Sequence, residues 1–159
     1  MSSATRNTKL AEKISQMRLE IAPIVHVETG VPPPEFPSTM LELFLLTEDQ
    51  LDTMAHYYAQ ITPNHTTRMY PQTMDWDRPI LARPREGDYT PENCKLNDYE
   101  RLKIKMRMFA QFIGMRGAET PRWELERQME LLKNKVDHSI AEEERLIPRK
   151  FYCGPSTYP

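Results

Sequence analysis

Histidines are the first residues whose type could support metal binding or acid-base catalysis. The chain has four: His26, His56, His65 and His138. A divalent cation usually needs two imidazoles and a carboxylate that converge on one point, and two histidines at i and i+4 are a common way to supply them. No two of these histidines have that spacing, and Asp75 and Asp77 flank Trp76 in a proline-rich stretch where Asp typically shapes turns. The sequence therefore predicts no metal site and no other cofactor.

Two cysteines, Cys94 and Cys153, could act as nucleophiles beside a histidine. No flanking motif supports that role, and Cys153, which precedes Gly154, is equally typical of a small buried apolar residue. The chain also lacks a Walker loop, a GxGxxG motif and a GxSxG motif, and its 5 glycines are too few for a phosphate-binding loop. An enzyme is thus the less expected class. The absence of a disulfide framework and of an apolar signal region predicts an intracellular protein of the cytoplasm or nucleus.

Ring-bearing side chains near the middle of the chain are the group that could line a small-molecule pocket. They are His56, Tyr57, Tyr58 and Trp76, and the pocket would lie between a helix at 47–61 and the segment 62–96. His56 falls on the side of the expected helix opposite Leu51 and Met54, which is the usual position of a solvent-facing residue. A small-ligand-binding protein or a small helical enzyme is therefore the alternative function.

Any such site must be positioned by helices, because four stretches repeat apolar residues with a helical period. They cover residues 8–22, 47–61, 98–116 and 120–147. Residues 40–46 form either a short helix or a buried strand, which periodicity alone does not decide. The expected fold class is mainly α, a small helical domain with long proline-rich irregular segments.

Capping signals define the ends of two of these helices. Thr47 with Gln50 and Asn97 with Glu100 have the spacing of capping boxes, in which each side chain bonds the other residue's backbone N–H. Gly117 is the expected stop of the helix that begins after Asn97.

The first and last helices are expected to be amphipathic. Residues 8–22 place Leu10, Ile14, Met17 and Ile21 on one face, and residues 120–147 do the same with Leu125, Met129, Leu132, Val136 and Ile140. The helix at 98–116 has an excess of basic residues, whereas the helix at 120–147 has an excess of acidic ones. Together with the short connection at 117–119, these charges predict an antiparallel C-terminal hairpin.

The chain has 14 prolines, and they gather in two irregular segments. Residues 23–38 are expected to be an extended linker between an N-terminal helix at 1–22 and a helical domain at 39–159. Residues 62–96 have prolines too close together for a helix but too many apolar residues for a free linker, so they are expected to wrap around the helices, with Trp76 and Tyr89 packed on them.

The helix at 98–116 has two apolar faces. Ile104, Met108 and Met115 lie nearly opposite the face that contains Leu102 and Phe109. The favoured interpretation is a central helix that is covered on both sides. The functional interpretation makes Ile104, Met108 and Met115 a partner-binding surface, because methionine adapts its shape to varied partners.

Composition excludes several function classes. The 159 residues include 39% hydrophobic and 28% charged residues, which is typical of one soluble globular domain and not of a disordered or membrane-spanning chain. With 21 basic against 23 acidic residues, no excess of positive charge points to nucleic acid. The sequence predicts a non-catalytic interaction or assembly module that binds a protein partner or associates with itself. A small molecule is expected only in the alternative.

Overall fold

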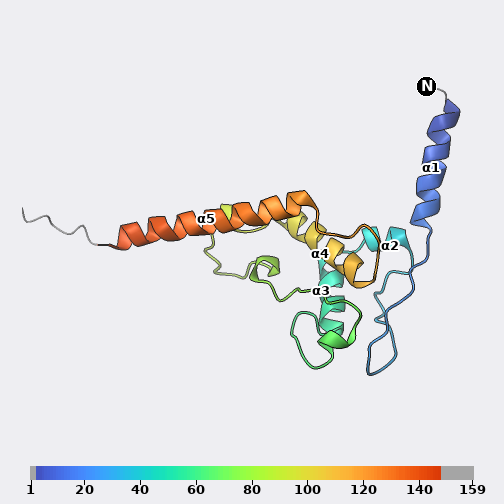
Figure 1. Cartoon of the computed structure of the whole chain (residues 1–159), viewed down its shortest axis with the longest axis horizontal. Coiled ribbons are helices and arrows are strands. Elements are labelled where there is room, and N and C mark those ends of the chain that lie inside the picture. Colours follow the sequence, from blue (N-terminus) through green and yellow to red (C-terminus); the bar gives the residue numbers. More distant parts are fainter. Residues whose placement is uncertain (1–2, 148–159) are drawn as a thin grey trace, which may run out of the picture.

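The structure is a computed structural model in which residues 3–147 are described, and it is mainly α, as predicted. The α-helices of this part are α1 (Ser3–Met17), α2 (Met40–Phe44), α3 (Glu48–Tyr57), α4 (Asp98–Phe112) and α5 (Arg122–Leu146). Three short 3-10 helices lie in the irregular segments: η1 (Thr67–Met69), η2 (Pro79–Leu81) and η3 (Glu92–Cys94). Figure 1 shows a central body around α3 and α4, from which α1 and α5 extend in different directions. Within the described range there is no strand, and the one β-bridge joins Glu20 to Thr39.

The core lies between α3, α4 and the segments that cover them. Aromatic rings dominate its centre, where Tyr58 lies 5.3 Å from Tyr70 and 5.1 Å from Phe112 between ring centroids. Leu51, Met54 and Phe109 belong to the same buried cluster. Burial of each large apolar side chain stabilises the fold by about 1.5–3 kcal/mol, so this cluster supplies most of the driving force for folding.

Both predicted capping boxes are present. The side chains of Thr47 and Asn97 each accept a hydrogen bond from the backbone N–H three residues on. The side chains of Gln50 and Glu100 in turn accept from the backbone N–H groups of Thr47 and Asn97. Thr39 caps the short helix α2, which decides between the two possibilities for residues 40–46. Local side-chain chemistry therefore sets these helix starts.

The ends of α3 and α4 come earlier than predicted. Gly114, with φ of 83°, takes the left-handed conformation just after α4, and the Met115 N–H then donates to the Ala110 carbonyl. Gly117, the predicted stop, lies beyond that turn. In the same way Ala59, with φ of 54°, follows α3, and the Gln60 N–H donates to the Ala55 carbonyl. A residue in this conformation reverses the chain and satisfies the last carbonyls.

The segment 23–38 lies against the body, although it contains no helix. Backbone carbonyls of Ile24 and Val31 accept hydrogen bonds from the hydroxyls of Tyr58 and Tyr57, and the Val27 N–H donates to the Tyr70 hydroxyl. Phe36 packs near Phe109, with 6.1 Å between the ring centroids. Residues of 23–38 therefore contribute directly to the folded body.

The segment 62–96 contributes Tyr70, Met74, Trp76 and Leu81 to the core. Tyr89, which was expected to pack on the helices, is instead 95% exposed. Prolines interrupt any longer helix here, so the backbone turns repeatedly and brings only some of its apolar side chains inward.

The predicted antiparallel hairpin of the last two helices is not evident. The first turns of α5 cross α4, where Arg107 pairs with Glu124 and Glu100 pairs with Arg127. Beyond this crossing, Asn134 bonds the Asn93 carbonyl of η3, and residues 135–147 are exposed. Figure 1 shows α5 running away from the body. The physical reason is that Leu131 is the only buried apolar residue within α5, a helix that is described in full.

Candidate functional site

The predicted partner residues Ile104 and Met108 are buried in the core, with exposed fractions of 1% and 5%. Met115 is half-buried and packs against the same cluster. Core residues from α3 and from the segment 62–96 share this cluster. The placement fits the favoured interpretation, a helix covered on both sides, because Ile104 and Met108 are buried and only Met115 keeps part of its side chain exposed.

The predicted ligand residues do not converge on one point. His56 is exposed, whereas Tyr57 is half-buried and packs edge-on against His26 with 5.2 Å between ring centroids. Tyr58 is fully buried, and burial, together with its tyrosine neighbours, raises the pKa of its hydroxyl. Trp76 lines a pocket.

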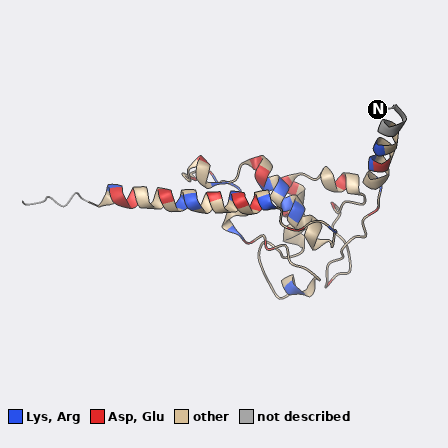
Figure 2. Ribbon diagram, turned by 45° about the horizontal axis from the view of Figure 1, so that its top comes forward, with Lys and Arg blue, Asp and Glu red and all other residues tan. Residues whose placement is uncertain are grey.

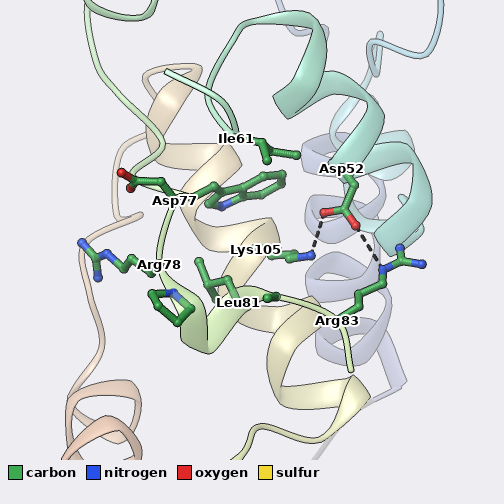
Figure 3. Close-up of a pocket in the computed structure, with 10 residues that line it drawn as sticks. Asp52, Ile61, Asp77, Arg78, Leu81, Arg83 and Lys105 are labelled. Carbon is green, nitrogen blue, oxygen red and sulfur yellow. Dashed lines mark hydrogen bonds and ion pairs between the residues drawn. The ribbon is translucent and has the colours of Figure 1, made fainter. Parts of the chain in front are cut away.

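That pocket lies between α3 and residues 76–83 and has a volume of about 400 Å³. Figure 3 shows Ile61 and Leu81 among the lining residues, with Asp52 and Arg83 to one side of the pocket and Asp77 and Arg78 to the other. Trp76 is 5% exposed, and its indole Nε1 is buried without a hydrogen-bond partner. A buried donor without a partner is uncommon in folded proteins.

A network of charges underlies the pocket and joins α3 to α4. Lys105 Nζ lies 2.9 Å from Glu48 and 2.6 Å from Asp52, and Arg101 also binds Glu48. Arg83 Nε adds a contact of 3.1 Å to Asp52. Arg101 and Lys105 are almost completely buried, so their charges depend on these carboxylates.

The network changes the titration of its central carboxylate. Burial by itself would raise the pKa of Glu48, but the hydrogen bonds from Arg101 and Lys105, with their charges, outweigh burial and lower this pKa from 4.5 to about 2. Our sequence reasoning missed this cluster. The available signal was the matched i, i+4 spacing of two acids on α3, Glu48 and Asp52, and two bases on α4, Arg101 and Lys105.

The predicted stripe of α5 is an exposed apolar feature. Its members are between 50% and 70% exposed: Leu125, Met129, Leu132, Val136 and Ile140. At about 100° per residue, the centre of the α5 stripe lies roughly 140° around the helix from Leu131, the residue that faces the body. The α5 stripe therefore points away from the core.

A second exposed stripe lies on α1. Leu10 and Ile14 are exposed and Met17 is half-buried, so this face has no cover along most of the helix. The neighbouring α2 exposes Leu41 and Phe44 as well, and Leu45, which follows it, is also exposed. Large apolar surfaces of this kind are typical of protein interaction sites.

Other chemistry is sparse in the part of the chain that the structure describes. No three potential metal ligands gather there, and no helix of that part combines the length and apolar character needed to cross a bilayer. Cys94 is buried and its thiol donates to Asn93, while Cys153 lies outside the described residues.

Comparison with known proteins adds no further assignment, because no family model, curated protein or solved structure matches the chain. Function is therefore inferred from the α1 and α5 stripes and from the pocket beside Trp76.

Proposed function

We propose that the protein is a non-catalytic interaction or assembly module that associates with further copies of itself through apolar helix faces. The observation that carries this proposal is the α5 stripe, whose five large side chains face solvent in the single chain. The α5 stripe takes the place of Ile104 and Met108, which are buried in the core, and of Met115, which packs against it. A reducing intracellular setting, cytoplasm or nucleus, remains part of the proposal.

The energetics favour covering the α5 stripe. Apolar surface that is removed from water contributes about 25 cal/mol per Å² to stability. Residues 135–147 are exposed, so they bury little apolar surface against the body. A partner helix laid along α5 would cover side chains from several consecutive turns. The cost of association offsets part of this gain, so a single helix contact predicts moderate and concentration-dependent association.

The mass of the protein in solution tests the proposal. We expect sedimentation of the full chain to show an average mass that rises above 18.7 kDa with concentration. Val136→Glu should return the mass to one chain, because it places a charge in the α5 stripe. Ala141→Glu is the matched control, since Ala141 is exposed on another side of the same helix. A wild-type chain that stays monomeric at every concentration would contradict the proposal.

A second candidate function is the binding of a small molecule in the pocket, favoured by the unpartnered Nε1 of Trp76 beside it. Native mass spectrometry of the purified chain should then show a retained small molecule. Ala82→Trp would fill the pocket from an exposed position and should remove the extra mass. Chains without added mass, together with no binding in a screen of small aromatic and apolar probes, would argue against this function.

A further inference from the structure

We propose that the occupant of the α5 stripe is α1 of a second copy of this chain, packed parallel to α5. This inference rests on the proposed self-association and specifies its interface. Each chain would supply one α1 as the inserting helix and one α5 as the receiving helix. One contact would then cover both exposed stripes.

The first observation that supports this pairing is the difference in charge between α1 and α5. The helix α1 contains three basic residues and one acidic residue, whereas α5 contains seven acidic and five basic residues. Ideal helix geometry places Lys9 and Lys13 along one edge of the α1 stripe and Glu12 on the back of the helix. Lys9 and Lys13 are exposed and have no ion-pair partner among the described residues.

The receiving edge of α5 is mainly acidic. Along one side of its stripe lie four acids and two bases: Glu126, Glu130, Asp137, Glu144, Arg122 and Lys133. Arg122 is already paired with Glu126. Figure 2 shows acidic and basic residues along the whole of α5. Exposed ion pairs contribute about 0–1 kcal/mol each, so the charges select partner and orientation while the apolar side chains supply affinity.

The relative direction of α1 and α5 follows from which edge of each stripe carries the charged residues. In a parallel pair of helices, the left edge of one stripe meets the right edge of the other, whereas in an antiparallel pair like edges meet. The lysines of α1 and the acids of α5 lie on opposite-handed edges, so only the parallel arrangement brings them together. The spacing also matches at the outer half of α5, because Leu10 and Ile14 lie four residues apart, as do Leu132 and Val136.

The inserting helix must come from another molecule. Residues just after α1 are fixed to the body, where the Leu19 carbonyl accepts from the Met40 N–H and Glu20 pairs with Thr39. Figures 1 and 2 both show α1 at the far end of the molecule from the outer half of α5. Within one chain, α1 therefore does not lie along α5.

Pairing of α5 with another α5 is the competing arrangement. An antiparallel pair would place the acidic edge of one α5 against the acidic edge of the other, which is repulsive. A parallel pair would avoid that clash but would leave the α1 stripe exposed. The combination of α1 with α5 covers both stripes and brings unpaired lysines to the acidic edge.

A complementation experiment tests the assignment. Ile14→Glu disables the inserting helix, and Val136→Glu disables the receiving helix. We expect each variant alone to sediment as a monomer, and an equal mixture of the two to form a complex of two chains, because each supplies the helix that the other lacks. Ser15→Glu and Ala141→Glu are exposed controls away from the stripes and should associate like the wild type. Circular dichroism should show equal helix content in Ile14→Glu and Ser15→Glu.

The outcomes separate this inference from the proposed function. If Ile14→Glu still associates while Val136→Glu does not, α5 pairs with itself, which overturns the α1 assignment and leaves self-association intact. A wild-type chain that never associates overturns both.

Exchanging the charges at the edges of the two stripes is a second test of the proposed pairing, and it uses charged residues outside the apolar stripes. Lys9→Glu with Lys13→Glu should weaken association about tenfold, since the sum of two reversed ion pairs is near 1.4 kcal/mol. Mixing this variant with Ile14→Glu should give a complex about tenfold weaker than that of Val136→Glu with Ile14→Glu, because the altered α1 must then insert against the original α5. A chain that carries Ile14→Glu with Glu130→Lys and Asp137→Lys should instead bind the altered α1 with restored affinity. Equal binding to the reversed and the original α5 would contradict the proposed orientation.

Discussion

Arg107 of α4 holds Glu124, in the first turn of α5, through two hydrogen bonds. The distances are 2.6 Å from Nε to Oε2 and 2.9 Å from Nη2 to Oε1. Glu124 is 1% exposed, and Arg107 also donates to the Ala118 carbonyl in the connection between the helices. This pair therefore fixes the point from which α5 leaves the body.

Removal of the Glu124 charge should loosen that attachment. We expect Glu124→Gln to lower the free energy of unfolding by about 3 kcal/mol, because it leaves a largely buried guanidinium without its counter-charge. Urea denaturation measures the effect. Glu126→Gln is the control, since Glu126 pairs with the exposed Arg122 and its loss should cost less than about 1 kcal/mol. Equal losses for the two variants would show that the Arg107–Glu124 pair has no special role.

Acid should destabilise the fold through Glu48. Because its pKa falls from 4.5 to about 2 on folding, the ionised carboxylate contributes stability that is fully present above pH 4.5 and is lost as the pH falls towards 2. Glu48→Gln should therefore be less stable than the wild type at neutral pH and should show a shallower decline between pH 4.5 and 2. Urea denaturation across that range is the measurement, and parallel curves for the two proteins would refute the assignment.

Gln60 should be indispensable although it carries no charge. Its Nε2 donates to the carbonyls of Tyr58 and Thr67, and its Oε1 accepts from the Met74 N–H. Since the side chain is buried, Gln60→Leu leaves three backbone groups unpaired and should cost about 3 kcal/mol or more. Gln72→Leu makes the same change at an exposed position and should alter stability by less than about 0.5 kcal/mol. Thermal and urea unfolding of both variants provide the comparison.

The turn after α4 should tolerate asparagine better than alanine. A Cβ at Gly114 would meet no neighbouring atom, so any cost of substitution arises from its positive φ of 83°. Gly114→Ala should destabilise by about 1 kcal/mol, because an L-residue is strained in this conformation. Gly114→Asn adds a Cβ as well but should cost less, since asparagine adopts left-handed backbone more readily. If the Gly114→Ala variant were as stable as the wild type, the left-handed conformation at residue 114 would not be what ends α4.

Helix starts were the most predictable part of the fold. The boxes at Thr47 and Asn97 involve residues three apart, so their formation depends on local chemistry that the sequence displays directly. The wrong stop at Gly117 has a physical cause too. Gly114 and Gly117 lie three residues apart and both adopt a positive φ, so the sequence alone does not show which of them ends the helix.

What covers an apolar face was not predictable. Periodicity identified the stripe of Leu125, Met129, Leu132, Val136 and Ile140, but the direction it faces depends on Leu131, a single residue outside the stripe. The same ambiguity applied to Ile104 and Met108, because their spacing in the sequence fits either a buried core position or an exposed surface position. The charges beneath the pocket could not be predicted either, because they come together only when α3 and α4 are placed side by side.

Beyond Asn134, the outer part of α5 has no hydrogen bond to another element in the described chain. Helical segments of fewer than about 12–15 residues are only marginally stable in water without tertiary contacts. The amides of residues 135–146 should therefore exchange rapidly with solvent in dilute solution and slowly once a second helix lies along the α5 stripe. Completion of this helix and association of two chains then become one cooperative event. The fraction of ordered backbone therefore rises with the protein concentration.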